Sequence, residues 1–172
     1  MTMRARLLEA DSRYSQHLRY AEKPGPLRRV AIFLAHSGDS WFWGLGLLLA
    51  WAVGSFPTRQ LAVQLVAGIA ITAVIVLALK RLIRRARPEG DWGSLYRRTD
   101  PHSFPSGHAA RMTMLWVLSA ALGPPWLGWL LLAWAPLVAL ARVAMGVHYL
   151  SDVIGGGLLG IVIGVALVSV FR

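Results

Sequence analysis

The sequence predicts an all-α membrane protein, a polytopic bundle of five spanning helices. Its 172 residues are 56% hydrophobic, and the apolar stretches approach the roughly 20 residues that a helix needs to cross a bilayer. Proline and glycine separate several of these stretches, and basic residues gather at their ends. A soluble helical bundle is the alternative, but five long apolar helices would leave too little polar surface to cover them.

The segment before the spans is basic and amphipathic. Apolar residues such as Leu7 and Leu18 recur at roughly helical spacing among arginines, up to a Pro-Gly pair. We expect residues 1–25 to form a basic helix on the membrane surface, with a solvated, partly disordered tail as the alternative. Residues 30–35 are apolar but too short to span, and polar residues at 36–40 interrupt them. This pattern predicts a half-inserted or interfacial helix.

The spans follow one another from residue 41 onward. They are predicted at residues 41–56, 61–79, 109–122, 126–145 and 153–171. The third is short, and a helix that begins at Ser106 would lengthen it. We expect tight turns at 57–60 and 123–125, where proline and glycine interrupt the apolar pattern. The chain is therefore predicted to form a single membrane domain, residues 1–172.

The chain carries a formal net charge of +10 and has no cysteine. The lack of cysteine excludes a disulfide framework, thiol catalysis and a cysteine-ligated metal. Such a charge could indicate a nucleic-acid partner, but the basic residues flank apolar runs. We therefore expect these residues to face anionic lipid headgroups, and we expect no nucleic acid as a partner.

Lys80 and Arg87 lie seven positions apart at the end of the second span. On a continuous helix they would share a face two turns apart, and Pro88 would stop that helix behind them. A lysine point charge and an arginine fork suit a tetrahedral anion. Basic residues at the end of a span are also ordinary topology signals, so this cluster alone leaves that alternative open.

Ser106, Gly107 and His108 open the third span, directly after Pro105. Serine is a good N-cap, and the first-turn amides of a helix, which have no partner within it, favour an anion. Gly107 would let a phosphate approach the backbone, and His108 could then reach a leaving-group oxygen. A capped helix with an unrelated histidine is the alternative.

Arg142, His148 and Asp152 run from the end of the fourth span into the fifth. Because His148 and Asp152 are four positions apart, Asp152 can accept a hydrogen bond from one imidazole nitrogen if the segment is helical. The other nitrogen would then be free to act as a nucleophile. The alternative is a surface His–Asp pair at the start of a helix.

Together the three clusters resemble the three-part signature of the type 2 phosphatidic acid phosphatase superfamily, which comprises lipid phosphate phosphatases and vanadium haloperoxidases. The matching parts are Lys80 to Arg87-Pro88, then Pro105-Ser106-Gly107-His108, then Arg142 to His148 and Asp152. The resemblance covers residues 80–171. It implies a six-helix core of the acid phosphatase/vanadium haloperoxidase type and an integral membrane enzyme like undecaprenyl pyrophosphate phosphatase.

The resemblance also implies a role for each of these residues. His148 would be the nucleophile that forms a phosphohistidine, oriented by Asp152, and His108 would be the acid that protonates the leaving group. The phosphoryl oxygens would be bound by Lys80, Arg87, Ser106, Gly107 and Arg142. No metal and no cofactor is expected, because the basic residues would take the role that metal ions have in other phosphoryl transfers.

Two features depart from the family pattern. Ala141 stands where the family usually has a serine before the arginine, so we expect one phosphate hydrogen bond to be missing.

The second departure is the number of spans. Many bacterial relatives have six spans and an outward-facing site, whereas this sequence predicts five spans and a partial segment at 28–40. With five spans, the N-terminus and the site share the more basic side of the membrane. The positive-inside rule then favours the cytoplasmic face of a bacterial inner membrane over the periplasmic face.

We expect this chain to hydrolyse a phosphomonoester or a pyrophosphate on a membrane lipid, with that lipid and the bilayer as its partners. The alternatives are a non-catalytic lipid-phosphate-binding membrane protein, which would be expected to lose His108 or His148, and a vanadate-dependent haloperoxidase, against which the short membrane-bound chain argues. Polyprenyl pyrophosphate, a polyprenyl phosphate sugar, phosphatidate and phosphatidylglycerol phosphate all stay open as substrates. The small-residue face of Gly156, Gly160 and Gly164 could serve an oligomer, although packing within the bundle is simpler.

Overall fold

The named elements of this chain are all helices over the part that the structure describes. The structure is a computed structural model and describes residues 2–90, 92 and 99–172. Its helices are α1 (Met3–His17), α2 (Pro26–Ser37), α3 (Ser40–Val53), α4 (Phe56–Ile83), α6 (Gly107–Leu122), α7 (Pro125–Ala144) and α8 (Leu150–Phe171). Asp91, Ser94, Arg97 and Arg98 of the long polar loop lie outside the described residues. The all-α prediction is confirmed for the described chain.

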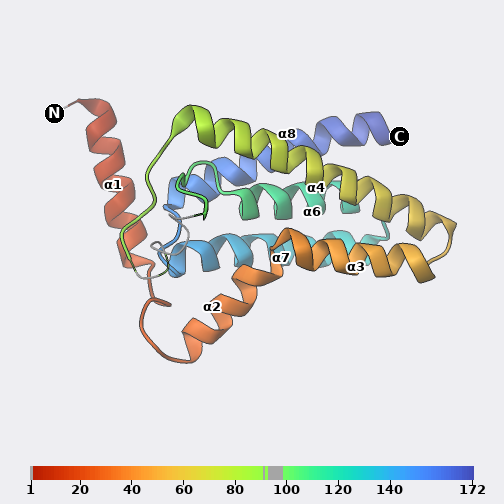
Figure 1. The fold of residues 1–172 in the computed structure, drawn as a ribbon, viewed down its shortest axis with the longest axis horizontal. Coiled ribbons are helices and arrows are strands. Elements are labelled where there is room, and N and C mark those ends of the chain that lie inside the picture. The colour runs from red at the N-terminus through yellow and green to blue at the C-terminus, as the bar shows by residue number, and fades with distance from the viewer. Residues whose placement is uncertain (1, 91, 93–98) are drawn as a thin grey trace.

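The longer helices form a bundle around α6. Figure 1 shows α3, α4, α6, α7 and α8 running along the long axis, with α1 lying across one end. α6 packs against α4, α7 and α8. Its side chains Met112, Met114, Leu115 and Leu118 are fully buried. Packing on several sides holds the first turn of α6, and the motif that it carries, in a defined place.

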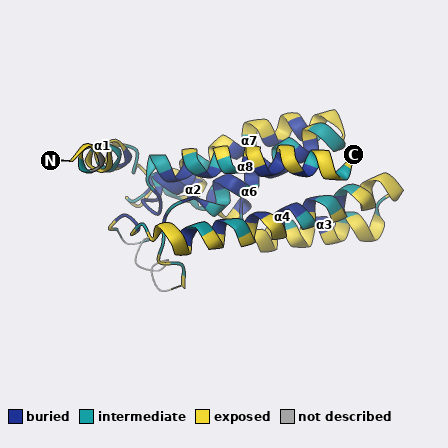
Figure 2. Cartoon of the chain, turned by 90° about the horizontal axis from the view of Figure 1, so that it is seen from above, coloured by how far each residue is buried: buried dark blue, intermediate teal, exposed yellow. Residues whose placement is uncertain are grey.

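Apolar side chains also cover the outside of the bundle. Figure 2 shows exposed residues along the outer faces of the long helices, with buried residues facing inward. Leu48, Val74, Trp129 and Val162 are each more than 60% exposed. An apolar surface of this extent is unfavourable in water and favourable against lipid tails. The bundle is therefore that of an integral membrane protein.

Three helices are long and apolar enough to cross a membrane by themselves. They are α4, α7 and α8, with 28, 20 and 22 residues. At the rise of an α-helix they extend about 42, 30 and 33 Å, against a hydrocarbon core of about 30 Å. The other two predicted spans correspond to α3 and α6, which have 14 and 16 residues. Each of the five predicted spans corresponds to a helix, although the first ends at Val53 and not at residue 56, and three of these helices meet the length of a crossing.

One predicted turn is wrong and the other is confirmed in part. Residues 57–60 are helical, because α4 begins before them and Pro57 occupies its first turn. The fixed φ of proline suits the first turn of a helix, where its missing N–H has no partner to lose. Residues 54–55 form the link between α3 and α4 instead. Of the turn predicted at 123–125, residues 123 and 124 link α6 to α7, and Pro125 is the first residue of α7.

α1 is shorter than the predicted amphipathic segment, and it is docked on the bundle. It ends at His17, and residues 18–25 connect it to α2. The hydroxyl of Ser15 accepts a hydrogen bond from the backbone N–H of Leu150, in the first turn of α8, at 2.8 Å. Leu7 stays exposed on α1. The helix therefore has one face against protein and another open to its surroundings.

The segment predicted to be a half-inserted or interfacial helix is part of α2, which leads into α3 through a short break. α2 includes His36 and Ser37, so the break lies at Gly38 and Asp39. Nε1 of Trp43 donates a hydrogen bond to the carbonyl of Ser37 at 2.9 Å. This contact ties the end of α2 to the start of α3.

The glycine face of α8 packs on α6. A Cβ atom added at Gly156 would collide with the carbonyl oxygen of Ser106, and one at Gly160 would collide with that of Ala110. The absence of side chains lets the two helices approach closely, as small residues do in membrane bundles. This approach places the start of α8 beside the start of α6, where the second and third sequence clusters meet.

Candidate active site

Four helix ends meet at one end of the bundle, around a cavity of about 300 Å³. They are the end of α4, the start of α6, the end of α7 and the start of α8. Six of the predicted site residues line the cavity, namely Lys80, Arg87, Gly107, His108, Arg142 and His148. Ser106 and Asp152 are buried close behind these residues. Three clusters that are separate in the chain therefore form one site.

The predicted continuous helix through Arg87 is wrong. α4 ends at Ile83, and its C-cap residue, Arg84, takes a left-handed conformation with φ 50° and ψ 38°. A left-handed residue ends a helix because it breaks the repeating backbone geometry. The chain then pairs Ala86 with His102 in an isolated bridge. Arg87 reaches the cavity because the loop turns back toward Lys80, not because the two share a helix face.

Asp100 joins Lys80 and Arg87 across the cavity. Nη2 of Arg87 lies 2.7 Å from Oδ2 of Asp100, and its Nε donates to the Asp100 carbonyl at 2.7 Å. The ammonium of Lys80 forms an ion pair with the same Oδ2. Burial would raise the pKa of this carboxyl, but Lys80 and then Arg87 hold it below its usual 3.8. A carboxylate therefore lies where two of the predicted phosphate ligands converge.

Arg142 and the residue before it face different surroundings. Arg142 is buried and lines the cavity. Ala141 instead belongs to an apolar cluster with Ala31 and Ala35 of α2. The side chain at this position thus serves the contact between α7 and α2. It is not among the described residues that line the cavity.

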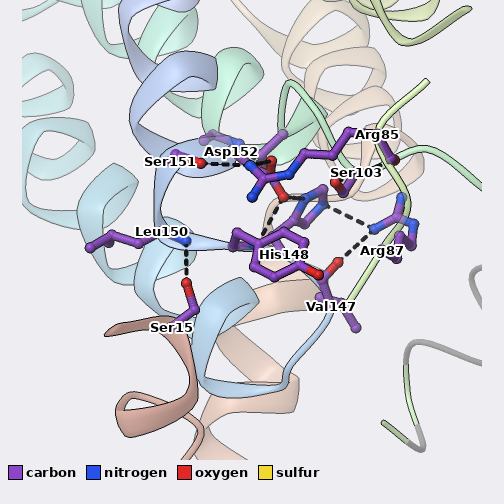
Figure 3. A network of polar contacts seen from close by, with 12 residues as sticks. Ser15, Arg85, Arg87, Ser103, Val147, His148, Leu150, Ser151 and Asp152 are labelled. Atoms are coloured by element: carbon purple, nitrogen blue, oxygen red, sulfur yellow. Dashed lines mark hydrogen bonds and ion pairs between the residues drawn. The ribbon is translucent and has the colours of Figure 1, made fainter. Parts of the chain in front are cut away.

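His148 lies in the turn between α7 and α8, with a charged group near each ring nitrogen (Figure 3). Nε2 lies 3.2 Å from Nη1 of Arg87, and Nδ1 lies 3.4 Å from Oδ2 of Asp152. Asp152 is in the first turn of α8, but His148 precedes the helix, so the two side chains approach across a helix start. The predicted hydrogen bond does not form, because Nδ1 of His148 has no hydrogen-bond partner among the described residues. Burial and the charges of Arg142 and Arg87 lower the pKa of His148 well below its usual 6.5. The imidazole is therefore neutral at neutral pH.

Asp152 is held from several directions. Its Oδ2 accepts a hydrogen bond from the backbone N–H of Tyr149 at 2.8 Å, which closes a capping box at the start of α8. Its Oδ1 accepts one from Nη1 of Arg85 at 2.8 Å. The N–H of Ser106 donates to its backbone carbonyl at 2.9 Å, so the starts of α6 and α8 are tied together. These contacts fix the orientation of the carboxylate that faces His148.

Arg85 connects this carboxylate to α1. Its Nη2 lies 2.6 Å from Oδ2 of Asp11. Its Nη1 lies 2.6 Å from Oγ of Ser151 (Figure 3). Its guanidinium also lies over the ring of Tyr149, 4.0 Å from the centroid. Asp11 accepts a further hydrogen bond from the N–H of Ser151 at 3.0 Å. α1 is therefore linked, through Arg85, to the pair of His148 and Asp152.

His108 lies in the first turn of α6 and faces a carboxylate from the break between α2 and α3. Its Nε2 lies 2.7 Å from Oδ1 of Asp39. The hydroxyl of the preceding Ser106 accepts a hydrogen bond from the N–H of Ala109 at 3.4 Å, as the predicted N-cap requires. The Ser106 hydroxyl thus caps α6. Gly107 and His108, the next two residues, line the cavity.

Several charged residues at the site were not among the predicted site residues. They are Asp39, Arg85, Asp100 and Arg111. A signal existed for Arg111, because a charged residue within an apolar span is a functional-site indicator. Asp39 lies in a polar interruption and Asp100 in a long polar loop. Such segments indicate a region of interest in the sequence, but they do not single out one residue. Arg85 stands among other arginines of a basic run, and no spacing distinguishes it.

Comparisons with known proteins cover the part of the chain that carries this site. The model of the PAP2 superfamily matches residues 61–172, a range that contains all three clusters. A decaprenylphosphoryl-5-phosphoribose phosphatase of Mycobacterium tuberculosis is 34% identical over 151 residues, which are 87% of this chain and 82% of that protein. An undecaprenyl-diphosphatase of Sulfolobus acidocaldarius is 32% identical over 140 residues, 78% of this chain and 66% of that protein.

A solved structure shares the arrangement of the helices. It is that of a transmembrane PAP2-type phosphatidylglycerolphosphate phosphatase from Bacillus subtilis, with a TM-score of 0.71 over 95% of this chain and 85% of that one. The two sequences are 21% identical, so the likeness is one of fold. The bundle around α6 is therefore a fold already known from a membrane protein.

Proposed function

Because the chain belongs to the PAP2 superfamily, we propose that it hydrolyses a phosphomonoester or a pyrophosphate on a membrane lipid. The observation that carries this proposal is the position of Nε2 of His148, 3.2 Å from Nη1 of Arg87 at a cationic cavity. The cations that line it are Lys80, Arg87, Arg111 and Arg142. A neutral imidazole that faces a group of cations suits attack on the phosphorus atom of a bound anion.

In the proposed reaction, Nε2 of His148 forms a covalent bond to phosphorus. The bond from phosphorus to the lipid oxygen breaks, and His108 supplies the proton that the leaving oxygen takes up. Water then attacks the phosphohistidine, a proton of that water passes to His108, and inorganic phosphate leaves. Asp152, near Nδ1, favours a proton on that nitrogen, so that Nε2 carries the lone pair. Both histidines return to their starting states.

The donor set of the cavity favours an anion over a divalent metal ion. Among the described residues that line it, Asp100 is the only carboxylate, and it is already paired with Lys80 and Arg87. Hard divalent cations prefer several oxygen ligands. The cationic side chains would instead neutralise charge on the phosphoryl oxygens. We therefore propose that the reaction is independent of metal.

The apolar wall of the cavity supports the proposal that the substrate is anchored in the bilayer. Ala73, Val76 and Leu77 of α4 line this wall. Leu77 is also exposed on the outer surface of the bundle, so the cavity borders the lipid-facing side of α4. A lipid could keep its chain in the hydrocarbon while its phosphate reaches the cations.

The choice among lipids follows from the relatives. The two relatives described above are named for decaprenyl and undecaprenyl compounds. We therefore propose a polyprenyl pyrophosphate or a phosphorylated polyprenyl phosphate sugar as the preferred substrate, ahead of phosphatidate and phosphatidylglycerol phosphate.

Phosphate release from this panel, by the purified protein in detergent with a chelator, tests the proposal. We expect release from at least one polyprenyl substrate, competitive inhibition by vanadate, and a loss of at least about 100-fold in His148→Ala. His17→Ala, a change of an exposed histidine on α1, is the control and should keep the full rate. A smaller loss in His148→Ala would place the nucleophile elsewhere. Activity that a chelator abolishes and magnesium restores would exclude the metal-independent reaction.

A further inference from the structure

We infer that Asp39, in the break between α2 and α3, is the positioning residue of His108. The inference rests on the proposed function, in which His108 gives a proton to the leaving group. Asp39 lies well before the three sequence clusters, and none of them includes it. The inference therefore adds a residue to the site from the polar interruption at 36–40, for which the sequence indicated no functional role.

The contact is short and uses one ring nitrogen. Nε2 of His108 lies 2.7 Å from Oδ1 of Asp39, and the two side chains are only 16% and 18% exposed. Because His108 lines the cavity and holds Asp39 through Nε2, Nδ1 is the nitrogen left for the substrate. Oδ2 of Asp39 lies 2.9 Å from Nδ1 of His36 and 3.1 Å from Nε1 of Trp41. With both oxygens engaged, the carboxylate has a fixed orientation.

The break that carries Asp39 is held by neighbouring helices. Nη1 of Arg111, in α6, donates a hydrogen bond to the carbonyl of Gly38 at 2.5 Å. Nε1 of Trp134, in α7, donates one to the hydroxyl of Ser37 at 2.8 Å. The two residues before Asp39 are thus tied to α6 and α7. This leaves the carboxylate little freedom to move away from His108.

Gly38 permits the close approach of the break to the imidazole. A Cβ atom at this position would lie 2.7 Å from Cγ1 of Val138 and 3.1 Å from Cδ2 of His108. A residue with a side chain would therefore push the break away from His108. Because Gly38 has no side chain, the backbone can lie close enough to His108 for the next residue, Asp39, to contact the imidazole ring.

The site then contains two His–Asp pairs that use opposite ring nitrogens. His148 has Asp152 near Nδ1 and presents Nε2 to the cavity, whereas His108 has Asp39 at Nε2. The two histidines have opposite tasks, since one must attack as a neutral base and the other must give up a proton. An aspartate at the far nitrogen orients either ring and stabilises its protonated form.

The charges around His108 make such a partner necessary. Arg111, on its own helix, and Arg142, on α7, line the same cavity, and both oppose a positive imidazole. Asp39 is the carboxylate that faces the ring from the other side. Burial would raise the pKa of Asp39, but the hydrogen bonds with His108 and then His36 hold it well below its usual 3.8. The carboxyl of Asp39 is therefore ionised at neutral pH.

Leaving-group dependence in the full-length purified protein tests this inference. Asp39→Asn removes the charge and keeps the size, so turnover of a lipid phosphate, whose alkoxide needs a proton, should fall about 10- to 100-fold. Turnover of p-nitrophenyl phosphate, whose leaving group departs without a proton, should change less than about threefold. Asp39→Glu restores the charge and should recover part of the lipid rate.

A double variant separates positioning from a general effect on folding. His108→Ala should show the same split between substrates, and adding Asp39→Asn to it should slow the lipid reaction no further, because Asp39 acts through His108. His17→Gln changes an exposed imidazole on α1 that does not contact Asp39, and it is the control, without a split. Equal losses on both substrates in Asp39→Asn, or full additivity with His108→Ala, would overturn the inference. If His108→Ala itself shows no split, the acid role in the proposed function fails as well.

Discussion

Nη1 of Arg85 lies 2.8 Å from Oδ1 of Asp152, and this contact joins the loop after α4 to the start of α8. The same guanidinium reaches Asp11 of α1 at 2.6 Å. The orientation of the carboxylate beside His148 therefore depends on a helix that lies across the end of the bundle. The N-terminal segment has a structural part in the site, besides any contact that it makes with the membrane.

Replacing Arg85 by methionine should loosen Asp152 and, through it, His148. We expect kcat to fall about 10- to 100-fold on lipid and aryl phosphates alike, as for other partners that orient a functional imidazole, with KM nearly unchanged. Arg85→Lys should recover little, because an ammonium lacks the fork that reaches two carboxylates. Steady-state kinetics measure both values, with Arg81→Met, an exposed neighbour, as the control. An effect confined to KM would contradict this role.

Asp100 should compete with phosphate for its two cations. Lys80 and Arg87 are both paired with its carboxylate, so an arriving phosphate must displace it. Asp100→Asn weakens that competition, and the inhibition constants of vanadate and inorganic phosphate should fall about two- to fivefold. The effect is modest because the side chain of Asp100 is 39% exposed. Weaker inhibition in this variant would show that Asp100 instead holds the two cations in place.

The acid limb of the pH profile should lie below pH 6.5. Burial, Arg142 and Arg87 lower the pKa of His148 below that value. Since the imidazole must be neutral to attack, kcat/KM should be level above the lowered pKa and should fall as the pH drops through it. Asp100 opposes the shift, so Asp100→Asn should move the limb to still lower pH. A limb that stays in place in this variant would mean that another group controls it.

Single cysteines can locate the site relative to the membrane, because the chain has none of its own. Glu89 is an exposed loop residue at the site end of the bundle, and Thr58 is exposed in the first turn of α4, at the opposite end. The positive-inside rule predicts that an impermeant thiol reagent labels Thr58→Cys in intact cells. It should label Glu89→Cys only after the membrane is opened. The reverse pattern would place the site on the outer face.

The errors in predicting the helices have local causes. Proline can begin a helix as readily as it can follow one, so Pro57 was compatible with a turn and with the start of α4. One left-handed residue, Arg84, ends α4 within a run of basic residues that contains no glycine to mark the end. Lys80 and Arg87 both line the cavity, although the continuous helix predicted for them is wrong.

The sequence by itself determined an all-helical membrane chain and six of the twelve described residues that line the cavity, because hydropathy, residue type and short spacing are properties of local segments. Only the tertiary structure decided which residues stand behind them. Asp39 meets His108 across 69 positions, and Arg85 meets Asp152 across 67. Such contacts form only when the helices pack against one another. The two residues of each contact are too far apart in the chain for their spacing to follow a helical period, so the sequence pattern does not indicate them.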